Sequence, residues 1–173
     1  GCTAELLVER CTRVEAGQTV LVHAAAGGVG LLLVQWLKHI GAIVIGSVGS
    51  SDKVGLVEQA GADHVVDTSH EDLAERVDAI TGGAGVRATF DGVGKDTWET
   101  SLRATGRRGI IASFGNASGP VTGVELGKLA SAGSLFCTRP TLFDYYREPA
   151  ERVAGAERMF TLVEQGALAV HVG

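Results

Sequence analysis

The sequence predicts an α/β fold in which one parallel six-stranded sheet is doubly wound, with helices on both faces. Six short β-type runs follow one another at roughly even spacing, and each gap between them holds a helix-compatible stretch. The runs also read as continuous apolar segments, which is expected when helices cover both faces of a parallel sheet. Together, these two observations exclude an all-helical or all-β domain.

The predicted strands are TVLVH ending at His23, AIVIGS ending at Ser47, ADHVV ending at Val66, VRATF ending at Phe90, GIIAS ending at Ser113 and GSLFC ending at Cys137. After the first strand, one helical face is apolar and can pack on the sheet, with its Trp in the core. That face consists of Val29, Leu33, Trp36, Leu37 and Ile40.

Three further elements are expected from local patterns. Residues 1 to 14 predict an amphipathic leading helix ended by residues 15 to 18, and residues 149 to 165 predict a closing helix. Residues 68 to 72 predict the start of a third helix, because a hydroxyl residue followed three later by an acid resembles a capping box. ALAVHV, residues 167 to 172, alternates as if it began another strand.

Composition restricts the classes of protein that fit. A length of 173 residues, 45% of them apolar, suits one domain with one core. The net charge of -5 is spread over mixed-sign segments, which argues against nucleic acid or an anionic membrane as a partner. Cys2, Cys11 and Cys137 lack metal-ligand or disulfide-framework spacing, and no apolar run approaches the roughly 20 residues of a membrane span. We therefore expect a cytoplasmic protein without a metal site.

The stretch HAAAGGVG carries the main functional signal. Ala25, Gly27 and Gly30 occupy the G-x-G-x-x-G spacing, with alanine first, between a predicted strand and a predicted helix. A small first residue permits the tight turn, Gly27 lets the backbone approach a pyrophosphate, and Gly30 lets the helix pack close to the sheet. Since free N–H groups at the helix start would face the anion, residues 1 to 173 are predicted to be a dinucleotide-binding (Rossmann) domain.

The end of the second predicted strand indicates which dinucleotide is bound. NAD binders usually place an acid there for the ribose 2′-hydroxyl, but here the sequence is SVGSSDK, residues 47 to 53. Small hydroxyl and glycine residues, with Lys53 one helical turn away, suit a 2′-phosphate better than a hydroxyl. Asp52 is assigned to the helix dipole. The predicted cofactor is therefore NADPH.

Three later segments follow predicted strands, at the edge of the sheet where ligands of open α/β folds bind. They are residues 91 to 94, residues 114 to 119 and residues 137 to 140. Glycine in these segments allows close approach by a cofactor, although it equally serves ordinary turns. The segments jointly outline a groove, in which Asp91 is expected to act as a turn or helix cap more than as a ribose ligand.

The combination of HAAAGGVG, DGVGKDTW, SFGNASG and GSLFCTRPTL closely resembles the NADPH-dependent quinone oxidoreductases, the zeta-crystallin-like, zinc-free branch of the medium-chain dehydrogenase/reductase superfamily. The resemblance covers nearly the whole chain. It implies hydride transfer from NADPH to a quinone or a related activated carbonyl, without a metal. It also implies that Ala26, Gly27, Gly28 and Val29, with Gly30 closing the motif, hold the pyrophosphate.

The same resemblance distributes the remaining cofactor contacts along the chain. It implies that Gly49, Ser50 and Lys53 bind the 2′-phosphate and that Val93 contacts the adenosine or ribose end. The nicotinamide side would be lined by Phe114, Gly115, Asn116, Ala117, Cys137, Thr138 and Arg139. Where many relatives carry a Tyr or His near the 2′-phosphate, this chain has Thr68, which can donate a hydrogen bond but cannot stack. No catalytic residue is assigned.

Relatives in this family are about twice as long and carry a GroES-like catalytic domain before the cofactor domain. The chain also begins without an initiator Met, so we expect a fragment that lacks this domain. Hydride transfer needs close, water-poor contact between donor and acceptor, so the fragment should bind NADPH but reduce quinone poorly. Alternatives are an enone or enoyl-thioester reductase of the same superfamily, a non-catalytic NADPH-sensing module, and a methyltransferase.

The sixth strand, Gly133 to Cys137, is an edge strand in the usual order 3-2-1-4-5-6 and exposes unpaired N–H and C=O groups. Pairing with its symmetry mate predicts a homodimer, which the resemblance also implies.

Several conspicuous side chains are assigned structural roles. His23 is expected to hydrogen-bond within the core, and Tyr145 and Tyr146 could border a substrate cleft or anchor a loop. Solvated or capping roles are expected for His39, His64, His70 and His171, and for the acids Glu71, Asp72, Glu75 and Asp78 beside Arg76.

Overall fold

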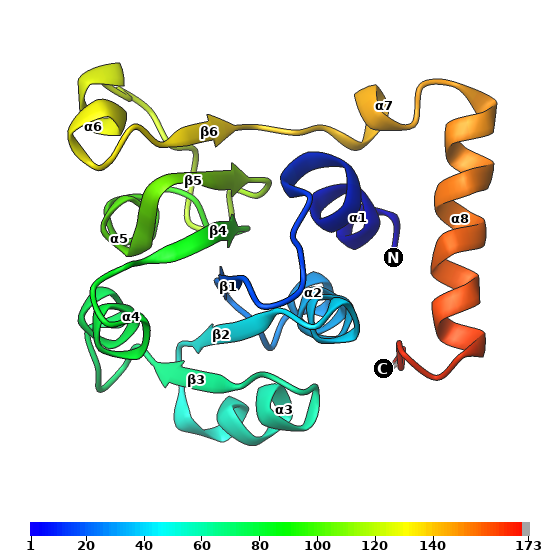
Figure 1. Cartoon of the computed structure of the whole chain (residues 1–173), viewed down its shortest axis with the longest axis horizontal. Helices are drawn as coiled ribbons and strands as arrows, with labels where there is room; N and C mark the ends of the chain where they lie inside the picture. The colour runs from blue at the N-terminus through cyan, green and yellow to red at the C-terminus, as the bar shows by residue number, and fades with distance from the viewer. Residues whose placement is uncertain (171–173) are drawn as a thin grey trace.

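The computed structural model describes residues 1–170 and contains one six-stranded sheet in the order β3-β2-β1-β4-β5-β6, with every neighbouring pair parallel (Figure 1). The strands are β1 Thr19–Val22, β2 Ile43–Val48, β3 His64–Asp67, β4 Val86–Asp91, β5 Thr105–Ser113 and β6 Phe136–Thr138. The predicted fold class and strand order are confirmed, and the predicted strand ends are correct to within one residue.

The helices fill the gaps between strands and both ends of the chain. They are α1 Cys2–Glu5, η1 Leu6–Thr12, α2 Gly28–Ile40, η2 Ser51–Lys53, α3 Val54–Gln59, α4 Leu73–Thr81, α5 Trp98–Ala104, α6 Leu126–Ser131, α7 Leu142–Tyr145 and α8 Pro149–Glu164. Among the helices described, none is long and apolar enough to cross a membrane.

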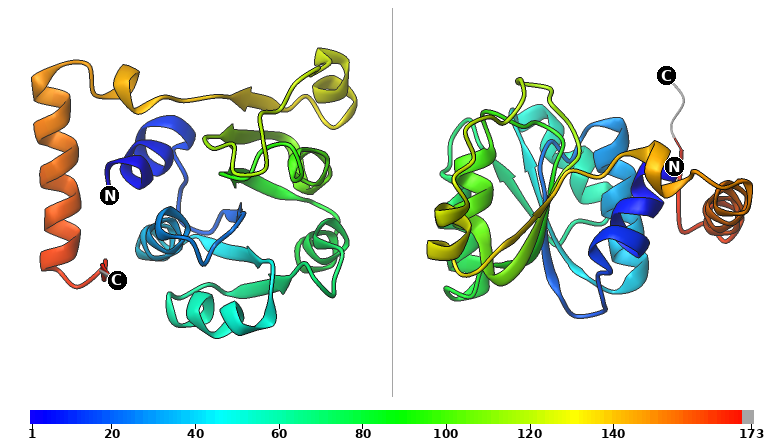
Figure 2. Two further views of the ribbon diagram at one scale, coloured as in Figure 1. Left: turned by 180° about the vertical axis from the view of Figure 1, so that it is seen from behind. Right: turned by 90° about the horizontal axis from the view of Figure 1, so that it is seen from above.

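Helices cover both faces of the sheet (Figure 2). On one face, α2 buries Leu33, Trp36 and Leu37 completely, which confirms the predicted apolar stripe and the core position of Trp36. On the other, Leu73 and Val77 of α4 pack in a separate cluster with buried residues of the sheet. The central strand β1 lies between β2 and β4, and the chain reverses its winding there, so a crevice is expected at the carboxyl end of β1.

The predicted start of the third helix is wrong. Helix α4 begins at Leu73, and its N-cap is Asp72, whose side chain accepts a hydrogen bond from the Glu75 N–H at 2.9 Å. Thr68 and Ser69 stay in the preceding loop because their hydroxyls donate to Val48 O and to Asp67 instead of capping a helix. Short polar side chains favour such local hydrogen bonds over helix formation.

Three other boundaries differ from expectation. The leading helix continues through η1 in π-helical form and ends at Thr12, because Arg13 is left-handed with φ of 50°. Strand β6 begins only at Phe136, since Gly133 and Ser134 both have positive φ and form a turn before it. Ala167–Val170 is not in a strand, and the rest of the predicted ALAVHV strand, together with His171, lies outside the described residues.

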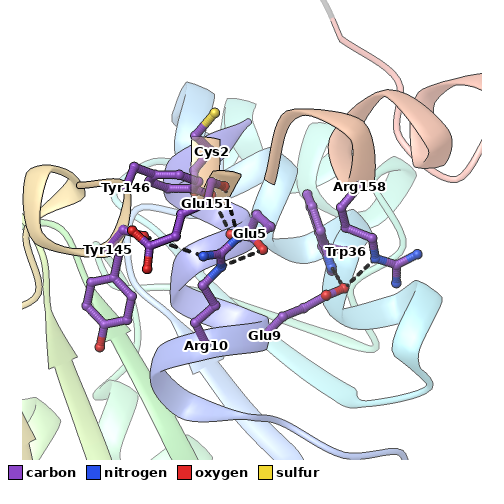
Figure 3. Close-up of polar contacts among 9 residues, drawn as sticks. All are labelled: Cys2, Glu5, Glu9, Arg10, Trp36, Tyr145, Tyr146, Glu151 and Arg158. Atoms are coloured by element: carbon purple, nitrogen blue, oxygen red, sulfur yellow. Dashed lines mark hydrogen bonds and ion pairs between the residues drawn. The ribbon is translucent and has the colours of Figure 1, made fainter. Parts of the chain in front are cut away.

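Helix α8 confirms the predicted closing helix and lies beyond α1, away from the sheet (Figure 1). A cluster of polar contacts joins α8 and the loop before it to the leading helix (Figure 3). Arg10 Nε donates to Glu5 at 2.9 Å, and the two other guanidinium nitrogens donate to the carbonyls of Tyr145 and Glu151. The Tyr146 hydroxyl donates to the buried carboxylate of Glu5. Tyr146 therefore anchors a loop, one of its two predicted roles.

A second set of contacts in the same interface joins α8 to α2 through Glu9 of η1. Arg158 Nε and Trp36 Nε1 both donate to Oε1 of Glu9, at 2.8 and 3.0 Å (Figure 3). The indole N–H of a buried Trp needs such an acceptor, so Glu9 both satisfies the core Trp and holds α8.

Candidate functional site

A cavity of about 460 Å³ opens at the carboxyl ends of β1, β2 and β3. Its walls come from the strand ends, the loop before α4 and the start of α5. They are lined by His23, Ala24, Ser47, Val48, Gly49, Thr68, Glu71, Asp72, Leu73, Val93, Asp96, Thr97 and Thr100. Of the predicted cofactor residues, Gly49, Thr68 and Val93 thus meet in one cavity at the switch point of the sheet.

The glycine turn directly follows Ala24, which lines this cavity. Gly27 is the N-cap of α2 and offers no side chain, so no residue described here caps the N–H groups of the first helical turn. A Cβ on Gly30 would lie 2.5 Å from Ala24 O and 2.7 Å from Ala25 O, whereas a Cβ on Gly28 would meet nothing within 4 Å. Gly30 therefore serves close packing, as predicted, while the exposed Gly28 leaves open space in front of the helix.

These features fit a diphosphate group. An uncapped helix N-terminus presents N–H donors and the positive end of the helix dipole. Ala26 and Val29, partly buried, flank the turn, and Ala24 adopts a φ of 49° that turns the chain sharply out of β1. The residues present could thus hold the pyrophosphate of a dinucleotide.

A buried polar chain lies beneath the cavity. Asp91 Oδ2 accepts a hydrogen bond from Ser101 Oγ at 2.8 Å, and Ser101 Oγ lies 3.0 Å from His23 Nε2. Because the single Ser101 hydroxyl hydrogen is directed at the carboxylate, His23 Nε2 must carry the hydrogen that it shares with Ser101. His23 Nδ1 is then the acceptor that faces Ser47 Oγ at 3.5 Å. Burial lowers the pKa of His23, so the imidazole is neutral. The predicted core role of His23 is confirmed.

Asp91 organises the turn that follows β4. Its Oδ1 accepts hydrogen bonds from the N–H groups of Val93 and Gly94, both at 2.9 Å, and the Thr97 hydroxyl donates to it at 2.8 Å. Asp91 is completely buried. It is therefore a turn residue, as expected, and it sets the position of Val93 in the cavity wall.

The predicted 2′-phosphate residues lie on the loop that leaves β2. Ser50 is the N-cap of η2, and Lys53, at the end of η2, is exposed and forms no ion pair within residues 1–170. Thr68 donates both its N–H and its hydroxyl to Val48 O, at 2.9 and 3.0 Å. In this arrangement the donors of Thr68 face the end of β2 instead of the cavity.

The other end of the groove has two smaller cavities, of about 280 and 250 Å³, with Arg139 in the wall of both. Phe114 lines the first, and Asn116 and Cys137 line the second. Arg139 Nη1 donates to Ser113 O at 2.9 Å, and the Asn116 amide, oriented with its oxygen toward Arg139, accepts from Nη2 at 3.3 Å.

The remaining predicted residues at this end have different surroundings. A Cβ on Gly115 would lie 2.1 Å from Gly92 O, so Gly115 allows two loops to touch. Ala117 is exposed, and Thr138 ends β6. Partial desolvation, with the charge of Asp91, raises the pKa of the Cys137 thiol, so this residue is not a ready thiolate.

Some residues of the site were not anticipated from the sequence. Thr3, Leu6 and Leu7 of the leading helix form one wall of the cavity that contains Phe114. Ser101 and Thr97 complete the Asp91 network from α5. No local pattern marks these residues, although DGVGKDTWETS places a Thr and a Ser at helical spacing after Asp91 and could have suggested a capped turn.

Comparison with known proteins agrees with this geometry. The family model described as zinc-binding dehydrogenase matches residues 28–159. A quinone oxidoreductase of Pseudomonas aeruginosa is 47% identical over 99% of this chain and 53% of its own length. A 2-haloacrylate reductase of a Burkholderia species is 42% identical over 97% of this chain and 51% of its own length. The crystal structure of Escherichia coli quinone oxidoreductase complexed with NADPH superposes with a TM-score of 0.96 at 44% identity, covering 99% of this chain and 53% of that one.

A doubly wound sheet with a glycine turn at its switch point defines a dinucleotide-binding domain of the Rossmann type. The chain belongs to the zinc-binding dehydrogenase family. Within that family, its predicted resemblance to the quinone oxidoreductases is confirmed over nearly its whole length. The chain spans about half the length of the curated relatives it matches. Despite the family's description, residues 1–170 hold no group of three or more His, Cys, Asp or Glu side chains that could bind a metal.

Proposed function

We propose that this chain is the NADPH-binding domain of a metal-independent oxidoreductase that transfers hydride to a quinone or a related activated carbonyl. The observation that carries the proposal is the uncapped N-terminus of α2 at the switch point where a dinucleotide binds, in the turn that follows Ala24 of the cavity wall. The bound cofactor supplies the hydride from its nicotinamide. The E. coli relative crystallised with NADPH supports the choice of cofactor.

The residues of the chain bind and orient the cofactor in this proposal. The turn from Ala26 to Gly30 holds the pyrophosphate, and Val93 contacts the adenosine or ribose end of the cofactor. Gly49, Ser50 and Lys53 bind the 2′-phosphate, with Thr68 beside them. The nicotinamide side is lined by Phe114, Gly115, Asn116, Ala117, Cys137, Thr138 and Arg139.

The domain needs a second half for efficient turnover, in this proposal. The smaller cavities beside Phe114 and Arg139 are open grooves, and hydride transfer requires a water-poor site. The roughly half-length match to relatives supports a catalytic domain elsewhere in the full protein. The isolated chain is then expected to bind NADPH and to reduce quinones poorly.

Lys53→Ala tests the cofactor assignment. Because Lys53 has no competing ion pair among the described residues, its loss should remove a charge-assisted contact worth about 1.5–3 kcal/mol. NADPH affinity, measured by fluorescence titration, should fall about tenfold or more while NADH affinity hardly changes. Lys128→Ala is the matched control, since Lys128 pairs with Glu99 on the surface. Equal losses for NADPH and NADH would contradict the assignment.

An activated alkene is the alternative acceptor. The 2-haloacrylate reductase among the relatives favours this alternative. A haloacrylate is an alkene conjugated to an electron-withdrawing group, and, like a quinone, it accepts hydride at a conjugated carbon. Comparing kcat/KM of the full-length protein for a quinone and for an enone separates the two. A much higher value for the enone would replace quinone as the proposed substrate.

The proposed assembly is a homodimer through the edge of β6. This strand pairs only with β5 among the described strands, and Phe136 in it is 61% exposed. Pairing with a second copy would cover both the open edge and this side chain. Sedimentation should show a dimer, and a monomer at high concentration would refute the pairing. The free thiols of Cys2, Cys11 and Cys137 fit the proposed cytoplasmic location.

A further inference from the structure

Asp67 is a nearly buried acid that neither the glycine motif nor the family resemblance marks. It is the last residue of β3, lies beside Val48 at the end of β2, and is 8% exposed. Its neighbours in the chain and across the sheet carry the proposed 2′-phosphate contacts. A carboxylate at this place would by itself repel a phosphate, so its retention needs an explanation.

The hydrogen bonds of Asp67 explain why a carboxylate is present at this place. Oδ2 accepts a hydrogen bond from the Ser51 hydroxyl at 2.5 Å, while Oδ1 accepts from the N–H and the hydroxyl of Ser69 at 2.9 and 2.6 Å. Ser51 lies between Ser50 and Lys53 on the loop after β2, and Ser69 lies on the loop after β3. One carboxylate therefore ties together the two loops on either side of the proposed phosphate position.

The negative charge of Asp67 strengthens its hydrogen bonds with Ser51 and Ser69. The Ser51 and Ser69 donors lower its pKa to about 2, so the group is ionised throughout the physiological pH range. Hydrogen bonds to an ionised acceptor are roughly twice as strong as neutral ones. Since the donors of Thr68 are directed at Val48 O, the loop from Gly49 to Lys53 must supply most of the contacts to a phosphate.

We propose that Asp67 is a positioning residue for cofactor selectivity: it fixes the loop of Ser50, Ser51 and Lys53 in the conformation that receives the 2′-phosphate. This inference rests on the proposed binding of NADPH in the groove. Asp67 acts through the loop and does not touch the cofactor. Its effect falls on NADPH and spares NADH, which carries a hydroxyl in place of the 2′-phosphate.

Asp67→Asn tests the proposal because it keeps the size of the side chain and removes its charge. Titration of the folded variant should show NADPH affinity reduced about fivefold or more, with NADH affinity changed less than twofold. Asp52→Asn is the matched control, since Asp52 is an exposed acid on the same loop. Removing its charge should leave NADPH affinity unchanged or slightly higher. Thermal melts verify that both variants are folded.

Ser51→Ala provides a second variant that removes only the hydrogen bond from the loop after β2. It should lower NADPH affinity in the same direction and by a smaller factor. If Asp67→Asn raises NADPH affinity, charge repulsion governs the site and the proposal is overturned. Equal losses for both cofactors also overturn it, since Asp67 would then support only the fold. Wild-type protein that prefers NADH would instead refute the cofactor assignment itself.

Discussion

Gly30 and Gly28 lie two residues apart in the glycine turn and should respond oppositely to a methyl group. In Gly30→Ala the new Cβ would lie 2.5 and 2.7 Å from the carbonyl oxygens of Ala24 and Ala25. These are backbone atoms that no rotamer change can move away, so helix α2 must shift from the sheet. In Gly28→Ala the Cβ meets nothing within 4 Å.

The magnitudes follow from these two environments. Overpacking costs about 1–3 kcal/mol, and a clash with two backbone oxygens belongs at the upper end. For a chain of 173 residues, about 3 kcal/mol lowers Tm by roughly 6–12 °C. Gly28→Ala should instead add about 0.4–1 kcal/mol, because alanine restricts the unfolded chain and fits the helix. Its methyl group nevertheless occupies the space in front of the helix where a pyrophosphate would approach.

The assay combines thermal and urea denaturation with NADPH titration of each variant. Gly30→Ala should be destabilised, whereas Gly28→Ala should be at least as stable as the unsubstituted chain yet bind NADPH more weakly. A Gly30→Ala protein with an unchanged Tm would refute the packing argument. Unchanged NADPH binding by Gly28→Ala would refute the proposed position of the pyrophosphate.

Two further predictions concern the buried hydrogen bonds of His23 and the packing of α8 against Tyr146. Burial lowers the pKa of His23 in the folded state, so just below pH 6.5 only the unfolded chain binds a proton at this imidazole. The free energy of unfolding should therefore decrease there by up to about 1.4 kcal/mol for each unit by which the pH is lowered. His23→Gln should flatten that slope in urea titrations between pH 5 and pH 8, and an unchanged slope would assign it to other groups. Gly155→Ala should destabilise the chain, since its Cβ would lie 2.4 Å from the Tyr146 ring, whereas the unobstructed Gly127→Ala in α6 should not. Equal melting temperatures for these two variants would contradict the anchoring role of Tyr146.

Much of the fold could be predicted because its signals are local. Continuous apolar runs predicted six parallel strands, and the helical spacing of Leu33, Trp36 and Leu37 predicted the buried face of α2. The predicted capping box failed because of hydrogen bonds that residue spacing cannot show. Thr68 and Ser69 bond to Val48 and Asp67, which leaves Asp72 as the cap.

The sequence by itself determined the doubly wound sheet and the glycine turn, because periodicity and the steric demands of Gly27 and Gly30 act between near neighbours. Only the tertiary structure decided which polar side chains form hydrogen bonds with one another. Ser51 meets Asp67 across 16 residues, His23 meets Ser101 across 78, and Tyr146 meets Glu5 across 141. The first two pairs form only when strand ends and helices converge at one edge of the sheet, and the third only when the loop before α8 packs on α1, so no local pattern encodes them.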